Sequence, residues 1–335
     1  EQFFLLRQPC RDIAEYKARW LGTLRYLEAV TAGLCREDVA AGAQHLLETT
    51  IERFVRAHHP GKAPMPVVLS GGVFANVHVN RAVSNLPMVS DVFVQPAMGD
   101  EGLSLGAALL AWRQQSGEPW RKPAAVGHTF LGPSFSRPRI EGACRRVSDS
   151  ARVVSYTPAE IAERIREGAI VGLFQGAMEF GPRSLGNRSI LATPTDHRIP
   201  ARLNARLGRS EFMPFAPSVL AEHADTYFEF PGRSHEASNY MTIAYPVRPE
   251  VRARIPAVVH VDGTARPQLV HRQTNPFFYA IIEEFFRLTG IPLVLNTSFN
   301  AHEEPIVCSP EDALAALRSG RVDVIAFGTL VAERF

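Results

Sequence analysis

Two arginines, an asparagine and three glycines are concentrated in the stretch GAMEFGPRSLGNRSIL, residues 176–191. The planar guanidinium groups of Arg183 and Arg188 suit two-pronged hydrogen bonds to a phosphate or a carboxylate. Asn187 and Ser189 add short neutral hydrogen-bonding groups, and the glycines allow backbone N–H groups to approach the same anion. The composition therefore predicts an anion-binding loop.

The alternative is a cluster of salt bridges at the surface, in which Glu179 pairs with one of the two arginines. Such exposed pairs contribute little to stability. A solvated cluster also has no need of three glycines and a proline around it. The composition favours the anion site over this alternative.

Two later segments carry polar groups that could converge on the same ligand. They are HVDGTARPQ, residues 260–268, and LNTSFN, residues 295–300, and their polar residues include His260, Asp262, Thr264, Arg266, Asn296, Ser298 and Asn300. Taken singly, each segment is also compatible with a turn that bonds to its own backbone. Together with the arginine loop they predict a site for a phosphorylated, amide-like or nucleotide ligand. His260 would act there as an acid or a base, unless it is a structural histidine.

A pair of glycines follows a short apolar run in LSGGVFANVHVN, residues 69–80. Glycines after a strand allow backbone N–H groups to approach a phosphate, and the next helix contributes its positive end. Gly71, Gly72 and Asn76 are the candidate binding residues. A tight turn with a solvated asparagine explains the same letters, and the residues alone leave both interpretations open.

An acidic residue, Asp100, stands at the mouth of a predicted helix in PAMGDEGLSLGAAL. A carboxylate at this position can stabilise the helix dipole without any further role. It can also bind a divalent metal beside a phosphate, but one carboxylate does not make a metal site. Local sequence therefore favours the structural role.

The elements that position these residues alternate between strands and helices. Apolar runs bounded by turn residues predict strands at 66–72, 91–96, 169–176, 239–247, 257–263, 267–272, 291–298 and 322–328. Helical spacing predicts helices at 38–59, 73–83, 102–112, 158–168, 275–290 and 309–320. This pattern is typical of the α/β class, and the later strands suggest a partly antiparallel sheet. We expect a first domain at 1–115, a linker rich in Gly, Pro and Ser at 116–136, and a second domain at 137–335.

Composition limits the classes of partner. The 36 Lys and Arg residues against 34 Asp and Glu residues give a net charge of only +2, which argues against nucleic-acid or membrane-surface binding. The four cysteines form no CxxC pair, so we expect reduced thiols in a cytoplasmic protein. The chain has neither an apolar run of ~20 residues nor the layout of a signal peptide. It also lacks an initiator methionine, and we expect it to begin inside a longer protein.

The motifs quoted above, together with EEPIVCSPEDAL, resemble the O-carbamoyltransferases of the nodulation and antibiotic-tailoring type. The resemblance spans nearly the whole chain, with the motifs in the same order. It implies the C-terminal lobe of a Kae1-like, actin-like ATPase domain (ASKHA fold), followed by a YrdC-like α/β domain. It also implies two reactions. The YrdC-like domain forms carbamoyl-adenylate from carbamoyl phosphate and ATP with Mg²⁺, and the Kae1-like domain transfers the carbamoyl group to an acceptor hydroxyl at a site with Fe²⁺ or a similar metal.

The resemblance assigns roles to the residues already singled out. Arg183, Arg188 and Arg266 would supply positive charge around the phosphate oxygens, and Asn296, Ser298 and Asn300 would hold the amide or nucleotide portion. Gly71, Gly72 and Asn76 match positions that face the nucleotide. Asp100 matches a metal-ligating aspartate, which reverses the inference from local sequence.

The chain departs from the family pattern in two places. The HxxxH metal motif of the first actin-like lobe is absent, so we expect an incomplete transfer site and a missing N-terminal lobe. In LNARLGRSEFMPFAPSVL, Met213 stands where an arginine is usual, which leaves Arg206 and Arg209 as the nearby cations.

Two other functions stay open at this stage. One is a threonylcarbamoyl-adenylate-type enzyme of tRNA modification, against which the near-neutral charge counts. The other is a non-catalytic nucleotide-binding remnant. The sequence names neither the acceptor, a sugar or another metabolite, nor whether the chain forms a homodimer.

Overall fold

The computed structural model describes residues 12–61, 63–117, 127–146, 151–209, 213–230 and 236–334. The chain divides into two compact units, residues 1–59 and residues 60–335. The first unit contains helices α1 (Ile13–Thr31) and α2 (Arg36–His58). The side chain of Asp12 caps α1 by accepting a hydrogen bond from the backbone N–H of Glu15 at 2.8 Å. The helix predicted at 38–59 is confirmed as α2, whereas α1 was not predicted.

The second unit opens with a small parallel sheet. Strands β1 (Met65–Leu69) and β2 (Val89–Val94) pair in parallel. Between them lie the 3₁₀ turn η2 (Gly72–Ala75) and helix α3 (Val77–Ser84), and α4 (Glu101–Ser116) follows β2. The strand–loop–helix order predicted for this region is confirmed.

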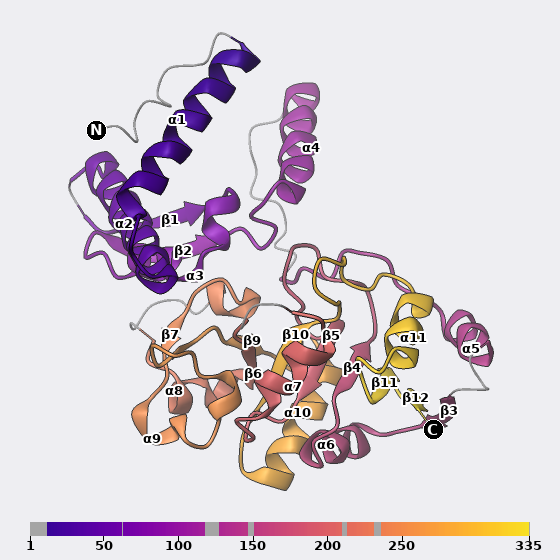
Figure 1. Cartoon of the computed structure of the whole chain (residues 1–335). Coiled ribbons are helices and arrows are strands. Elements are labelled where there is room, and N and C mark those ends of the chain that lie inside the picture. Colours follow the sequence, from indigo (N-terminus) through magenta and orange to yellow (C-terminus); the bar gives the residue numbers. More distant parts are fainter. Residues whose placement is uncertain are drawn as a thin grey trace. The chain divides into compact units, whose positions relative to one another are not determined.

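An eight-stranded mixed sheet dominates the second unit (Figure 1). Its order is β3-β12-β11-β4-β5-β10-β6-β9. All neighbours are antiparallel except the pairs β11–β4 and β6–β9, so the predicted α/β fold with a partly antiparallel sheet is confirmed. The strands are β3 (Ala151–Ser155), β4 (Val171–Phe174), β5 (Arg188–Ala192), β6 (Ala216–Leu220), β9 (Gln268–Val270), β10 (Leu293–Ser298), β11 (Val324–Phe327) and β12 (Leu330–Arg334).

Helices cover this sheet. Every residue of β4, β5, β6 and β11 is buried, so both faces of the central strands are covered. Helix α6 packs against α10, and α11 packs against α5 (Figure 1). The helices are α5 (Arg137–Arg145), α6 (Pro158–Arg166), α7 (Ile199–Arg206), α8 (Ala224–Tyr227), α9 (Pro249–Arg252), α10 (Pro276–Thr289) and α11 (Pro310–Arg318). Ser309 and Asp312 form a capping box at the start of α11, with reciprocal side-chain to backbone hydrogen bonds.

Two predicted strands are largely wrong. Residues 239–247 form the end of the 3₁₀ turn η4 (Glu236–Tyr240) and the two-residue strand β7 (Tyr245–Pro246). Residues 257–263 contain part of the turn η5 (Pro256–Val258) and no strand. Most of the apolar residues in the first run and Ala257 and Val258 in the second are buried, but burial alone does not distinguish a strand from a packed turn. A further turn, η3 (Ala221–His223), and the short strand β8 (Thr264–Ala265) complete the unit.

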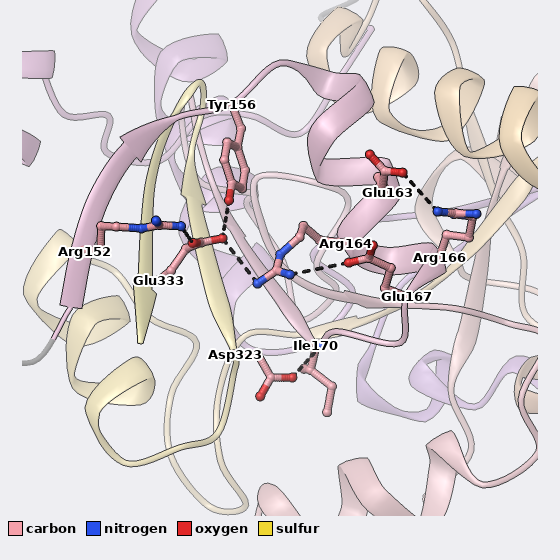
Figure 2. A network of polar contacts seen from close by, with 9 residues as sticks. All are labelled: Arg152, Tyr156, Glu163, Arg164, Arg166, Glu167, Ile170, Asp323 and Glu333. Carbon is pink, nitrogen blue, oxygen red and sulfur yellow. Dashed lines mark hydrogen bonds and ion pairs between the residues drawn. The ribbon is translucent and has the colours of Figure 1, made fainter. Parts of the chain in front are cut away.

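A network of charged groups fastens the edge of the large sheet (Figure 2). The carboxylate of Glu333, on β12, is buried and accepts hydrogen bonds from Tyr156 at 2.5 Å and Arg152 at 2.7 Å. Arg164, on α6, lies 3.4 Å from the same carboxylate. The network therefore joins β12 to β3 and α6, which lie more than 150 residues earlier in the sequence.

Candidate anion-binding site

The arginine-rich segment is a loop between β4 and β5, but it ends earlier than its sequence suggests. Residues 188–192 form β5, in the middle of the large sheet. Three glycines in the loop have a backbone that other residues rarely adopt, with φ of +49° at Gly176, +125° at Gly181 and +106° at Gly186. A Cβ atom at Gly186 would lie 2.2 Å from the ring of Phe278. Glycine is therefore required there both for its backbone and for the close approach of α10.

A buried carboxylate organises this loop from within. Oε1 of Glu179 accepts hydrogen bonds from the backbone N–H groups of Leu185 at 2.6 Å, Asn187 at 2.8 Å and Arg188 at 3.3 Å. Burial raises the pKa of Glu179, and the three backbone bonds oppose that rise. Its Oε2 is buried without a hydrogen-bond partner. The salt-bridge cluster considered as the alternative is therefore wrong, because Glu179 bonds to backbone N–H groups in the interior.

Arg188 is also turned inward. Its side chain is fully buried and donates to the carbonyl oxygens of Gln175 at 2.7 Å, Asn187 at 2.8 Å and Pro133 at 3.1 Å. Burial lowers the pKa of its guanidinium to about 10, despite the opposing charge of Glu179. These bonds give Arg188 a role in holding the loop in shape. Its predicted contact with an anion stays a prediction.

Arg183 and Arg266 form a pair of half-buried cations. Burial lowers the pKa of Arg183, and burial together with the charge of Arg183 lowers the pKa of Arg266 well below its usual value. Nη2 of Arg183 donates to the carbonyl oxygen of Ala75 at 3.0 Å, and the Nε atoms of both arginines are buried without a partner. Within the described part of the chain, neither guanidinium forms an ion pair with a carboxylate. Two unneutralised cations at one place are a favourable site for an anion.

His260 lies beside this pair as a neutral imidazole. Burial lowers its pKa to about 4, and the positive charge of Arg266 contributes. Its Nδ1 lies 3.1 Å from Oγ1 of Thr264, which donates a hydrogen bond to Oδ1 of Asp262 at 2.7 Å. His78, on α3, lies 3.9 Å from the other oxygen of Asp262. The turn at 260–266 therefore adjoins α3.

The contacts through Ala75 and His78 bring three predicted segments together. The segment that follows the glycine pair reaches Arg183 through Ala75 and reaches the 260–266 turn through His78. Gly71 itself has a φ of +121° and bonds to Met98, and Gly72 begins η2. The side chain of Asn76 caps α3, so its predicted contact with a nucleotide stays a prediction.

The remaining predicted residues bond mainly within the protein. Nδ2 of Asn296 donates to Ser184, Ser218 and Gln268, although its Oδ1 is buried without a partner. Asn187 donates to Ala177, Ser189 accepts from Gly186, Ser298 pairs with Ser189 at the end of β10, and Asn300 donates to Glu304. These contacts place Asn187, Ser189 and Ser298 at the base of the arginine loop, whereas the bond of Asn300 to Glu304 does not involve the loop. Their roles toward a ligand remain untested.

Sequence reasoning did not identify Gln268 and Asn275, which anchor the loop from the opposite side. Nε2 of Gln268 donates to the carbonyl oxygen of Leu185 at 2.8 Å, and Nδ2 of Asn275 donates to Oδ1 of Asn187 at 3.0 Å. Both are buried. Asn275 precedes a proline at a helix start, which signals a cap but gives no indication of its contact with the loop.

A metal site does not form from the residues that the structure describes. Asp100 is exposed at the start of α4, and no group of three or more His, Cys, Asp or Glu side chains suited to a metal occurs in the described ranges. The three described cysteines, Cys35, Cys144 and Cys308, are free, and Cys10 lies outside the described residues. None of the described helices is long and apolar enough to cross a membrane.

Comparison with protein families decides the family. The model for the carbamoyltransferase C-terminus matches residues 162–334, which is more than half of the chain, and the model for the carbamoyltransferase N-terminus matches residues 15–109. The chain belongs to the carbamoyltransferase family. The arginine loop, the 260–266 turn and β10 all fall within the C-terminal match, and the glycine pair falls within the N-terminal match.

Relatives of this chain include nodulation proteins. It is 36% identical to nodulation protein NolNO of Sinorhizobium fredii, over 89% of this chain and 44% of the relative. It is 35% identical to uncharacterized protein sll1178 of Synechocystis, over 88% of this chain and 52% of the relative. The chain thus spans about half the length of the curated relatives it matches.

A solved structure, full-length HypF in the phosphate- and nucleotide-bound form, has a TM-score of 0.38 and 21% identity. The match covers 55% of this chain and 22% of HypF. A likeness this low carries no argument about the fold or the ligand.

Proposed function

We propose that this chain binds carbamoyl phosphate at Arg183 and Arg266 and, with ATP and one water molecule, forms carbamoyl-adenylate, inorganic phosphate and pyrophosphate. A longer protein containing the chain would transfer the carbamoyl group to a hydroxyl of a small-molecule acceptor. Membership of the carbamoyltransferase family supports the class of reaction. The observation that carries the proposal for this chain is the pair of half-buried guanidinium groups without a described carboxylate partner.

Electrostatics give the reason why such a pair suits a phosphate. Removing two like charges from water and holding them close together costs free energy, which lowers the pKa values of both groups. A doubly negative phosphate placed between them reverses that cost and makes charge-assisted hydrogen bonds. Hydrogen-bond donors that are already in place where negative charge develops also favour adenylation. This reaction depends on positive charge around the phosphate oxygens more than on covalent catalysis by the protein.

The surrounding residues would keep the arginines in place. Glu179 and Arg188 fix the two ends of the loop that carries Arg183, through bonds to backbone N–H and carbonyl groups. Arg266 follows directly on β8, which pairs with β7. Mg²⁺ bound with ATP would neutralise the nucleotide phosphates. We further propose that residues 137–335 form the YrdC-like adenylating domain and that residues 1–115 belong to the actin-like lobe.

The residues that the structure describes do not fit Fe²⁺ or a similar metal. Asp100 is exposed and has no second or third ligand in the described ranges. This chain spans about half the length of its relatives. The remaining metal ligands would therefore come from other parts of the longer protein.

Calorimetric titration of the full chain with carbamoyl phosphate tests the anion site. Arg183→Met and Arg266→Met should each weaken binding by about tenfold or more, because each removes a charge-assisted contact. Arg198→Met is the matched control, since Arg198 is an exposed arginine paired with Asp196. Unchanged binding in both test variants would contradict the proposal.

Stability measured without ligand provides a second readout. Arg266→Met should leave the melting temperature unchanged or raise it, because a half-buried cation without a described carboxylate partner is replaced by an apolar side chain of similar length. Carbamoyl phosphate should raise the melting temperature of the unsubstituted chain and not that of the variant. A variant that melts lower and still binds would point to a structural arginine.

Release of pyrophosphate distinguishes the reaction from its nearest alternative. We expect release with carbamoyl phosphate, ATP and Mg²⁺, and none when threonine and bicarbonate replace carbamoyl phosphate. The opposite preference would favour a threonylcarbamoyl-adenylate-type enzyme. The absence of release with either mixture would exclude adenylation by this chain alone.

A further inference from the structure

A chain of hydrogen bonds with a fixed direction ends on His260. The hydroxyl of Thr264 lies 2.7 Å from Oδ1 of Asp262 and must donate to it, because a carboxylate only accepts. Thr264 has one hydroxyl proton, so its oxygen is left to accept from Nδ1 of His260 at 3.1 Å. His260 Nδ1 therefore carries a proton. The backbone supports this order, since the N–H of Thr264 also donates to Oδ1 of Asp262 at 3.0 Å.

The second nitrogen of the ring is consequently an acceptor. A neutral imidazole with a proton on Nδ1 has a lone pair on Nε2. Within the described ranges Nε2 has no hydrogen-bond partner, and the residue as a whole is only partly buried. Three charged or titratable groups face this histidine: Arg266 and His78 disfavour a second proton, and Asp262 favours one. Burial and Arg266 outweigh Asp262, so the imidazole stays neutral near pH 7.

Two neighbouring groups, the acceptor on His260 and the cation of Arg266, match the two ends of one kind of molecule. Carbamoyl phosphate has a phosphate, which suits a guanidinium, and an amide NH₂, which needs an acceptor. Acetyl phosphate has nearly the same shape and charge but carries a methyl group in place of the NH₂. An acceptor that faces a methyl group has no hydrogen-bond partner. The free energy of the missing hydrogen bond is the basis of selection between close analogues.

We infer that His260, oriented by Thr264 and Asp262, accepts a hydrogen bond from the carbamoyl NH₂ and thereby selects carbamoyl phosphate against acyl phosphates that lack an N–H. This inference rests on the proposed function. It names His260 as the residue that determines specificity, and Thr264 and Asp262 as positioning residues that act through it. It requires no bond to form or break.

Paired titrations of the full chain with carbamoyl phosphate and acetyl phosphate test the selection. One hydrogen bond between neutral groups corresponds to about a three- to tenfold preference for carbamoyl phosphate. Thr264→Val should reduce the preference to less than about twofold while acetyl phosphate binds as before, because the arginines are untouched. Thr264→Ser keeps the hydroxyl and should keep the preference.

Nitrogen-15 NMR of the histidine rings tests the protonated nitrogen directly, without any ligand. The spectrum of the unsubstituted chain should show a proton on Nδ1 of His260, with the signal assigned from its loss in His260→Gln. In Thr264→Val the signal should move toward a mixture of the two neutral forms. A merely structural threonine would not change which nitrogen carries the proton.

The results of the titrations and the spectrum distinguish failure of the His260 assignment from failure of the proposed function. Binding of neither ligand would overturn the proposed function and this inference with it. Equal binding of both ligands by the unsubstituted chain, or a proton on Nε2 in the spectrum, would overturn the inference alone. If Thr264→Val fails to fold, the spectrum and the ligand preference of the unsubstituted chain still decide.

Discussion

The guanidinium carbon of Arg188 lies 3.6 Å from the ring centroid of Phe174, across the pairing of β5 with β4. The ring covers one side of a cation that is fully buried, while three carbonyl oxygens receive its N–H groups. A planar guanidinium can make both kinds of contact at once, because its donors lie in its plane and its faces are free to stack. This relationship fixes the beginning of a central strand and the end of the arginine loop.

Replacing this arginine by lysine should destabilise the fold. We expect Arg188→Lys to lower the free energy of unfolding by about 3 kcal/mol, because an ammonium group cannot stack on Phe174 and reach the same carbonyls. Urea unfolding followed by circular dichroism measures the loss. Arg198→Lys, at an exposed site, should change the value by less than about 0.5 kcal/mol. Equal effects at both sites would contradict a structural role for Arg188.

Substitution of two glycines should have opposite effects. Gly186→Ala should destabilise the protein by more than about 2 kcal/mol, because it combines a positive φ with a Cβ that would lie 2.2 Å from Phe278. Gly106→Ala, within α4, has open space around its Cβ and should stabilise by about 1 kcal/mol or less. Thermal unfolding of both variants measures the contrast. A neutral Gly186→Ala would show that α10 does not approach the loop this closely.

The network around Glu333 should contribute measurably to stability. Tyr156→Phe removes one hydrogen bond to a buried carboxylate, and we expect a loss of about 1–2 kcal/mol in the free energy of unfolding. Glu163→Gln removes an exposed ion pair with Arg166 and should cost less than about 0.5 kcal/mol (Figure 2). Urea unfolding distinguishes them. A loss at Glu163 as large as that at Tyr156 would contradict the importance of burial.

Acid should weaken the fold through His260. Its folded pKa of about 4 lies below the ordinary value of 6.5, so between these values the unfolded chain binds more protons than the folded one. The free energy of unfolding therefore falls as the pH drops from about 6.5 to about 4. His260→Gln should show a shallower fall over this range when unfolding is measured at several pH values. Curves of the same slope would mean that His260 binds protons equally in the folded and the unfolded protein, which would contradict the lowered pKa.

Local order was largely predictable from the sequence. The helical spacing at 158–168, 275–290 and 309–320 corresponds to α6, α10 and α11, each with a capping residue that the sequence displays. Apolar runs also located β1, β2, β4, β10 and β11, and the fully buried strands β4 and β11 are continuously apolar, as burial on both faces requires. By contrast, β3, β6 and β12 were not predicted. The partners of β3 and β6 lie far along the chain, and such pairing leaves little local signal. The strand β12 lies only two residues after β11, so its omission has no such reason.

The sequence by itself determined the family and the types of residue that the site contains, because motif order and side-chain chemistry are properties of the letters. Only the tertiary structure separated the two arginines of the loop. Arg188 is turned inward to carbonyl oxygens and Phe174, whereas Arg183 lies beside Arg266, which is distant in sequence. The tertiary structure also showed that Glu179, which the sequence left as a possible surface ion-pair partner, is a buried hydrogen-bond acceptor. Which charges are buried and which neighbours they meet depends on how β4, β5 and the 260–266 turn pack together, and a linear sequence does not contain that information.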